Sequence, residues 1–211
     1  SGFTGIPTNT VRIAIGVSPN QPGYVYLLAG PRTSSGSFAG VYISLNSGVD
    51  FVARANTPNI LGGATSGIDD RAQAWYDLAI EINPTNAANI ITGGIDLWSS
   101  TDRGGSFTNR TSWVQDITPA SKYVHADIHN LTYNPLNNKL YACSDGGISE
   151  SSDHGVNWTN LWDDLQIMEY YHLSGYDGDA NKLIGGAQDN GTNYRKNNSS
   201  HYYHIEGADG H

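Results

Sequence analysis

The stretch SSDHGVNW at residues 151–158 decides the fold, because the chain contains it in three versions. The other two are STDRGGSF at residues 100–107 and SLNSGVDF at residues 44–51. All three begin with serine, have Asp or Asn at the third position and glycine at the fifth, and end with an aromatic residue. We call these three stretches the repeat loops. Their recurrence along one chain predicts repeated structural units.

Each repeat loop has the residues of a tight turn rather than those of an active site. Asp153 can accept hydrogen bonds from backbone N–H groups of its own turn, and Gly155 can take the positive φ that the turn requires. Trp158 is expected to bury its ring between repeats. Asn46 stands in place of the carboxylate in one loop, which a catalytic role would not tolerate. We therefore assign a structural role to Ser44, Asn46, Gly48, Phe51, Ser100, Asp102, Gly104, Phe107, Ser151, Asp153, Gly155 and Trp158.

The sequence that precedes the repeat loops is also repeated. A strand, a turn with proline and a second strand come before each loop, as in DLAIEINPTNAANIITGG and HNLTYNPLNNKLYACSDGG. Pro84 and Pro135 are 51 residues apart, whereas longer loops place Pro19 and Pro84 65 residues apart. The predicted repeat units are residues 8–70, 71–120, 121–165 and 166–211.

Four short strands in a unit of about 40 to 50 residues are typical of a β-propeller blade. The sequence thus predicts an all-β fold of about three and a half four-stranded blades, with the fourth unit breaking off. Such a number of blades cannot close a ring, so we expect a fragment of a larger propeller. A β-sandwich is the alternative, but three loops in register with three proline turns argue against it.

The composition favours β structure and argues against several classes of protein. The 211 residues include 25 Gly, 13 Tyr and 5 Trp, and only 15% are charged. The formal net charge of -9 argues against binding to a nucleic-acid backbone, which needs clustered Lys and Arg. No apolar run approaches the length of about 18 residues that a membrane helix needs.

The repeat loops resemble the Asp-box, or bacterial neuraminidase repeat, of sialidases, xyloglucanase-type glycoside hydrolases and the sortilin propeller. Longer stretches are similar to blades of large secreted Bacteroidetes proteins: AWYDLAIEINPTNAANIITGGIDLWSSTDRGGSF, VHADIHNLTYNPLNNKLYACSDGGISESSDHGVNW and LIGGAQDNGTNY. Those proteins are described as sortilin-like or glycosyl-hydrolase-like and commonly end in a type IX secretion sorting domain. The resemblance covers most of residues 70–211. It implies an extracellular or cell-surface location, and further blades or another chain as partners.

The stretch YVHADIHNL at residues 123–131 holds the strongest candidates for chemistry. We expect His125, Asp127 and His129 to alternate along one face of the strand segment that leads into the blade's first strand, which lines the channel of a propeller. Adjacent pairs could share a divalent cation if another blade supplied more ligands. A structural hydrogen-bond network is the competing interpretation.

Other polar residues at blade edges are expected to converge on the same channel mouth. In this hypothesis Asp127 forms the floor of a polar pocket with Asp145 and Asp189. Each of the latter lies near glycine, so ordinary turn chemistry is the alternative. The pocket suits sugar hydroxyls slightly better than Ca²⁺, which prefers all-oxygen ligands. We expect no organic cofactor and leave a structural divalent cation open. The candidate binding residues are His125, His129, Asp145, Gln188, Asp189, Asn190 and Asp209.

Glycoside hydrolysis needs two carboxyl groups on either side of one bond. Asp77 and Asp127 are the best candidates for a catalytic pair, since both come just before predicted first strands. The proline alignment, however, pairs Asp77 with Ile128, so the two carboxyl groups are not at equivalent repeat positions. Trp75 and Tyr76 are expected mainly to pack between blades, although an exposed aromatic ring could stack on a sugar.

The sequence therefore predicts a secreted or cell-surface propeller module that binds a glycan or a protein partner. The alternative is a xyloglucanase-like glycoside hydrolase that acts on a polysaccharide through Asp carboxylates. A second alternative is a structural component of a surface assembly that has no small ligand.

Overall fold

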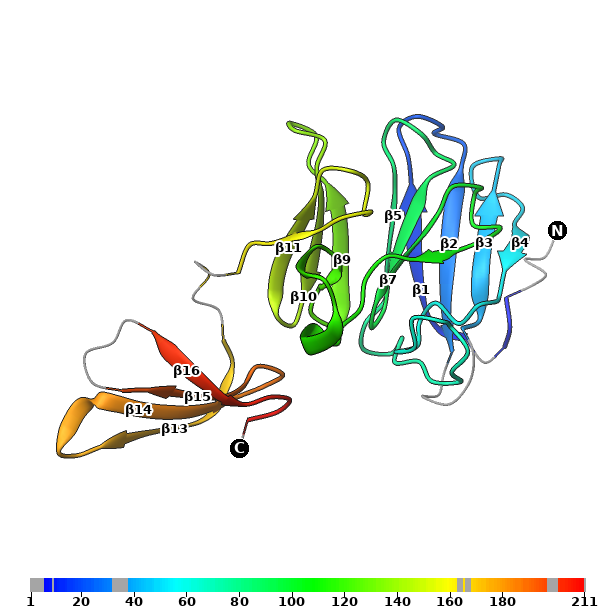
Figure 1. The fold of residues 1–211 in the computed structure, drawn as a ribbon. Coiled ribbons are helices and arrows are strands. Elements are labelled where there is room, and N and C mark those ends of the chain that lie inside the picture. The colour runs from blue at the N-terminus through cyan, green and yellow to red at the C-terminus, as the bar shows by residue number, and fades with distance from the viewer. Residues whose placement is uncertain are drawn as a thin grey trace. The chain divides into compact units, whose positions relative to one another are not determined.

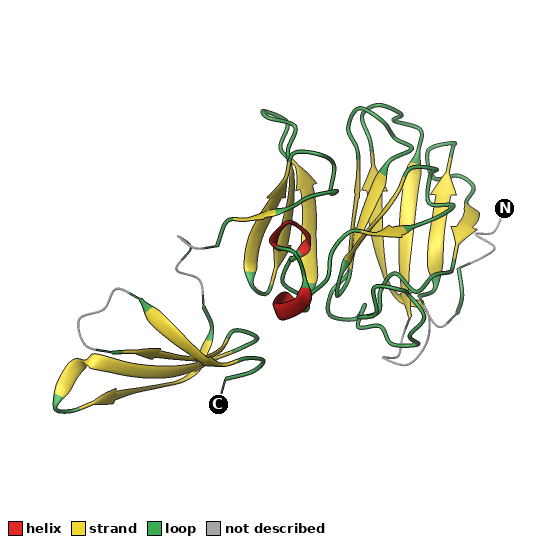
Figure 2. Ribbon diagram, in the orientation of Figure 1, coloured by secondary structure: helices red, strands yellow, loops and turns green. Residues whose placement is uncertain are grey.

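A computed structural model describes residues 6–8, 10–31, 38–162, 165, 168–196 and 201–210. It divides into two compact units, Ser1–Asp163 and Asp164–His211, each of which is described by itself. Strands dominate both units (Figure 2). The helical segments of the described residues are two 3-10 helices, η1 (Gln115–Ile117) and η2 (Ala120–Lys122). No helix in these ranges has the length and hydrophobicity of a membrane span.

The strands form antiparallel sheets of four strands, each in sequence order (Figure 1). The first sheet contains β1 (Thr10–Val17), β2 (Val25–Pro31), β3 (Gly40–Ser44) and β4 (Val52–Ala55). The second contains β5 (Ala79–Ile82), β6 (Ile90–Gly93), β7 (Leu97–Ser100) and β8 (Thr108–Asn109). The third contains β9 (Ile128–Tyr133), β10 (Leu140–Ser144), β11 (Gly147–Ser151) and β12 (Thr159–Asn160). The fourth contains β13 (Tyr170–Tyr176), β14 (Asp179–Ala187), β15 (Gly191–Arg195) and β16 (Tyr202–Glu206).

The predicted all-β fold of four-stranded sheets is confirmed. The fourth unit is more complete than the half unit that the sequence predicted, because β16 pairs with β15 and finishes the sheet. This unit has no repeat loop after its third strand, so the sequence offered no marker for its last strand.

The first three sheets pack face to face in Ser1–Asp163, with their first strands together: β1 contacts β5, and β5 contacts β9. One core cluster joins Val41 of the first sheet to Ile90 of the second. A second cluster joins Ile91, the next residue along β6, to Leu140 and Trp158 of the third sheet. Successive side chains of a strand point to opposite faces, so the second sheet is buried on both faces.

The repeat loops share one hydrogen-bond pattern. Ser151 Oγ donates to Asp153 Oδ1 at 2.9 Å and accepts the Gly155 N–H at 2.8 Å, while the Asn157 N–H donates to Asp153 Oδ1 at 2.8 Å. The equivalent bonds recur in residues 44–51 and 100–107. In each loop the turn is closed by two successive residues with positive φ, as with His154 at 60° and Gly155 at 88°.

The glycines of the second and third repeat loops pack against the preceding sheet. A Cβ on Gly155 would lie 2.5 Å from Ile91 Cδ1, and a Cβ on Gly104 would lie 2.8 Å from Val41 Cγ1. Since such distances are far below van der Waals contact, any side chain at these positions would push two sheets apart. The loops at residues 100–107 and 151–158 therefore also serve as spacers between neighbouring sheets, in addition to closing their own turns.

Candidate functional site

A network of polar side chains lies where β5 and β9 begin. The Tyr76 hydroxyl donates to Asp145 Oδ2 at 2.7 Å, and His129 Nε2 lies 2.7 Å from Asp145 Oδ1. The rings of Tyr76 and His129 meet edge to face, with centroids 4.9 Å apart. These contacts tie the turn between β10 and β11 to the segment that precedes β5.

The side chain of Gln73 binds two further carboxyl groups, those of Asp77 and Asp127. Its Nε2 donates to Asp77 Oδ2 at 3.1 Å and also to Asp127 Oδ1. Carboxylate oxygens of Asp127 and Asp145 lie within 4.8 Å of each other. The second and third sheets thus bring three carboxyl groups to one rim of Ser1–Asp163, from segments that are distant in the sequence.

The three carboxyl groups have different environments. Asp77 is completely buried, and its Oδ1 has no hydrogen-bond partner among the described residues. The pKa of Asp77 is raised to about 8, mainly by burial and in part by the nearby charge of Asp127, against the opposing hydrogen bond from Gln73. Burial thus favours the protonated form of Asp77. Asp127 and Asp145 are only partly buried, so solvent and ligands reach them.

The prediction that His125, Asp127 and His129 alternate along one strand face is wrong. The strand β9 begins only after Asp127, whose φ of 68° turns the chain out of the extended conformation. His129 joins the network, whereas the ring of His125 packs so closely on Gly146 that a Cβ there would lie 2.4 Å from it. A left-handed turn, not strand alternation, places Asp127 beside its partners.

The other predicted binding residues belong to Asp164–His211 and form a local group there. The Asp189 N–H donates to Asp209 Oδ1 at 3.1 Å, and Asn190 Nδ2 donates to the Gln188 carbonyl at 3.0 Å. Tyr171 also donates to Asp209 Oδ1, at 3.4 Å. Gln188, Asp189 and Asn190 form the turn between β14 and β15, and Asp209, which follows β16, accepts hydrogen bonds from Asp189 and Tyr171.

Sequence reasoning missed Gln73 and assigned Tyr76 to packing. Both lie just before Asp77, in a tight turn where the Tyr76 and Asp77 N–H groups donate to the Gln73 carbonyl at 2.7 and 3.1 Å. The same turn leaves Trp75 61% exposed, with its ring centroid 5.7 Å from that of Tyr76. A large aromatic ring exposed beside a polar network indicates a binding site. The sequence alone did not show that the Trp75 ring is exposed.

Comparison with known proteins identifies the architecture. No family model and no curated protein matches the chain. Among solved structures, the GH74 xyloglucanase from Xanthomonas campestris matches with a TM-score of 0.50 and 20% identity, over 86% of this chain and 27% of that chain. The chain folds as blades of a β-propeller. At this level of identity the likeness shows the fold alone.

Two further structures are similar at lower scores. The GH74 enzyme from Niastella koreensis has a TM-score of 0.47 and 16% identity, over 90% of this chain and 29% of that chain. YCF48 bound to a D1 peptide has a TM-score of 0.47 and 12% identity, over 94% of this chain and 56% of that chain. The chain spans less than a third of the length of either GH74 enzyme.

Proposed function

We propose that this chain is a β-propeller module of a secreted or cell-surface protein and that it binds a glycan at the rim where β5 and β9 begin. The exposed ring of Trp75, beside the network of Tyr76, His129 and Asp145, carries this proposal. Ligand sites combine aromatic surface with a few fixed polar groups. A sugar presents the matching surfaces, since its C–H groups can cover the indole and its hydroxyls can reach the polar network.

The polar groups of this rim are held in fixed positions. Asp145 has both carboxylate oxygens engaged by Tyr76 and His129, so its orientation does not depend on a ligand. The His129 side chain is 36% exposed and that of Asp145 14% exposed. Fixed groups lose little conformational entropy on binding, which favours recognition of a ligand whose hydroxyls are also fixed on a ring.

Glycoside hydrolysis by Asp77 and Asp127 is the second candidate function, favoured by a protonated acid beside a carboxylate. Two features favour binding instead. Asp77 is completely buried, so a polysaccharide does not reach it. Both carboxyl groups also accept from one nitrogen of Gln73, whereas a catalytic pair flanks the scissile bond at about 5 Å or more.

The first sheet suggests where further blades or another chain would pack. Alternate residues of β1 are exposed and apolar: Val11, Ile13, Ile15 and Val17. A contiguous apolar strip of this kind is typical of an interaction surface. A blade of the same repeat, from the same protein or from a partner chain, fits this face. If the chain is a structural component of an assembly, it would pack against a neighbour through this apolar face of β1 and would need no glycan.

Trp75→Ala is expected to weaken binding of neutral oligosaccharides at least about 10-fold, as for an aromatic residue at the centre of an interface. The measurement is isothermal titration of the chain with the best ligand from a panel of neutral polysaccharide fragments. Trp113→Ala is the matched control, because Trp113 is 47% exposed in a different loop. Equal affinity for Trp75→Ala and wild type would refute binding at this rim. Release of new reducing ends from the panel would favour hydrolysis.

A further inference from the structure

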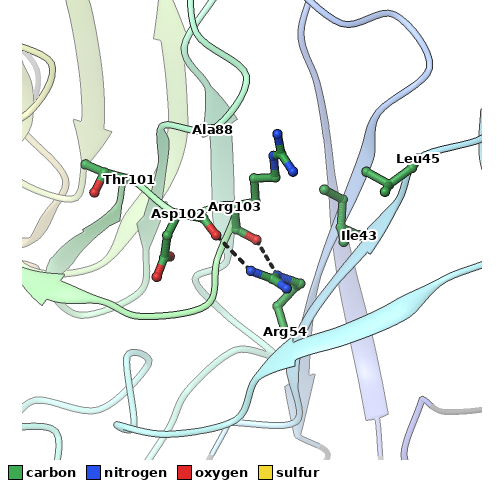
Figure 3. Close-up of a pocket in the computed structure, with 7 residues that line it drawn as sticks. All are labelled: Ile43, Leu45, Arg54, Ala88, Thr101, Asp102 and Arg103. Atoms are coloured by element: carbon green, nitrogen blue, oxygen red, sulfur yellow. Dashed lines mark hydrogen bonds between the residues drawn. The ribbon is translucent and has the colours of Figure 1, made fainter.

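A groove between the first and second sheets is separate from the rim described above. It has a volume of about 340 Å³ and is lined by Ile43, Leu45, Arg54, Ala88, Thr101, Asp102 and Arg103 (Figure 3). The first sheet contributes two apolar side chains and one arginine, the turn between β5 and β6 contributes Ala88, and the repeat loop of the second sheet contributes the rest. Two guanidinium groups and an apolar wall therefore border one small space.

Arg54 is fixed in this groove by the neighbouring sheet. Its Nε donates to the Arg103 carbonyl at 3.0 Å, and one of its terminal nitrogens donates to the Asp102 carbonyl at 2.8 Å (Figure 3). The backbone carbonyls hold the guanidinium plane without neutralising its charge. Arg54 thus presents its remaining N–H groups as a preorganised cation.

The Arg103 side chain is a cation without an acceptor among the described residues. Its backbone has a φ of 63° and its N–H donates to the Ala88 carbonyl at 3.0 Å, so the base of the side chain is fixed. Its guanidinium carbon lies 5.5 Å from the centroid of the Tyr24 ring. This stacking directs the cation but leaves its N–H groups free for a ligand.

The single carboxylate that lines the groove makes no hydrogen bond to these cations among the described residues. Asp102 turns its carboxylate into its own loop, where it accepts from Ser100 Oγ at 2.7 Å and from the N–H groups of Gly105 and Ser106 at 2.9 Å each. The hydrogen bond from Ser100, with those from Ser106 and Gly105, lowers the pKa of Asp102 to about 2. Its hydrogen bond with Arg54 is through the backbone carbonyl, and two arginines against one carboxylate leave the groove lining with a net positive charge on an otherwise acidic chain.

We propose that this groove binds the carboxylate of a uronic acid residue in an acidic glycan. The carboxylate would lie between the guanidinium groups of Arg54 and Arg103, which match the planar geometry of a carboxylate. The C–H face of the sugar ring would cover Ile43 and Leu45. An acidic amino-acid side chain offers the same charge but no ring to fill the apolar side of the groove. This inference does not rest on glycan binding at the Trp75 rim.

The next groove, between the second and third sheets, provides an internal comparison. Arg110 follows its repeat loop at the same distance as Arg54 follows the first loop, and its Nε donates to Ser99 Oγ at 2.6 Å. His154 replaces Arg103, and its Nδ1 lies 2.9 Å from Asn83 Nδ2. The lining of this groove has one arginine and an imidazole that is already paired, so it lacks a second guanidinium group.

The test is isothermal titration of the chain with trigalacturonate at low ionic strength. Arg103→Gln is expected to weaken binding at least 10-fold, the loss of one charge-assisted bidentate contact. Its melting temperature should fall only slightly, because the Arg103 side chain makes no hydrogen bond among the described residues and loses only its exposed stacking on Tyr24. Arg110→Gln, the matched control in the second groove, should bind as wild type does.

Several results would overturn this proposal. Equal affinity of Arg103→Gln and wild type would exclude the groove as the site. A neutral trisaccharide that displaces trigalacturonate would show that the carboxylate is not recognised. Triglutamate that binds as tightly as trigalacturonate, with the same dependence on Arg103, would assign the groove to acidic peptides instead of sugars.

Discussion

Trp158→Ala is expected to lower the free energy of unfolding by about 3 to 5 kcal/mol, the range for large aromatic residues in a core. Trp158 is 3% exposed and belongs to the cluster that joins the second and third sheets through Ile91 and Leu140. Its indole N–H donates to the Gly155 carbonyl at 3.1 Å. Truncation would therefore leave a cavity between two sheets and an unpaired carbonyl in the repeat loop.

Denaturant unfolding of wild type and of Trp158→Ala measures this loss of stability. The control Trp113→Ala should lower the free energy of unfolding by only about 1 kcal/mol, because Trp113 is half exposed and loses one hydrogen bond, from its indole N–H to the Gly63 carbonyl. Trp158→Ala molecules that remain folded should bind glycan as wild type does. Loss of glycan binding without loss of stability would show that the repeat loops are functional sites and not structural ones.

The stability of the chain is expected to fall as pH rises from about 4 to about 8, because of buried carboxyl groups. The pKa of Asp77 is raised to about 8 by burial, and so is that of Asp96, which is nearly as buried. Between its ordinary pKa of about 4 and its folded value, each group binds a proton in the folded state but not in the unfolded state. The stability that the protonated Asp77 and Asp96 carboxyl groups contribute is thus fully present below about pH 4 and is lost by about pH 8.

Asp77→Asn isolates the contribution of one group, since Asn resembles a protonated carboxyl group. The variant should match wild type near pH 4 and exceed its stability by up to about 5 kcal/mol at pH 8, from the four-unit difference in pKa. Unfolding curves measured across this range test the expectation. Asp116→Asn, at an exposed position in η1, serves as control and should keep the wild-type slope. A slope unchanged by Asp77→Asn would show that Asp77 is ionised in the folded protein.

The repeat loops were predictable from sequence because their chemistry is local. Ser151, Asp153 and Gly155 lie within five residues and satisfy one another, so the spacing alone indicates the turn. Each of the first three sheets carries such a loop, so the sequence was enough to predict these three sheets. The strand β16 follows a turn with no such marker, and its existence depends on pairing with β15.

The site was less predictable because its contacts are between sheets. Asp77 and Asp127 were expected to be partners, and Gln73 does connect them, but the complete burial of Asp77 follows from the packing of the second sheet on its neighbours. The positive φ of Asp127 depends on its tertiary contacts, so the sequence suggested a straight strand instead. Tyr76 and Asp145 meet across 69 residues, a distance at which no periodic pattern applies.

Hydrogen exchange of the chain with and without a saturating neutral oligosaccharide tests the central claim most directly. A glycan bound where β5 and β9 begin should slow exchange of backbone amides in residues 73–77 and 127–129, and in the turn at Asp145. Amides of the repeat loop at residues 100–107 should exchange at unchanged rates. Protection that is confined to other segments would contradict the account, and so would binding that leaves residues 73–77 and 127–129 unprotected.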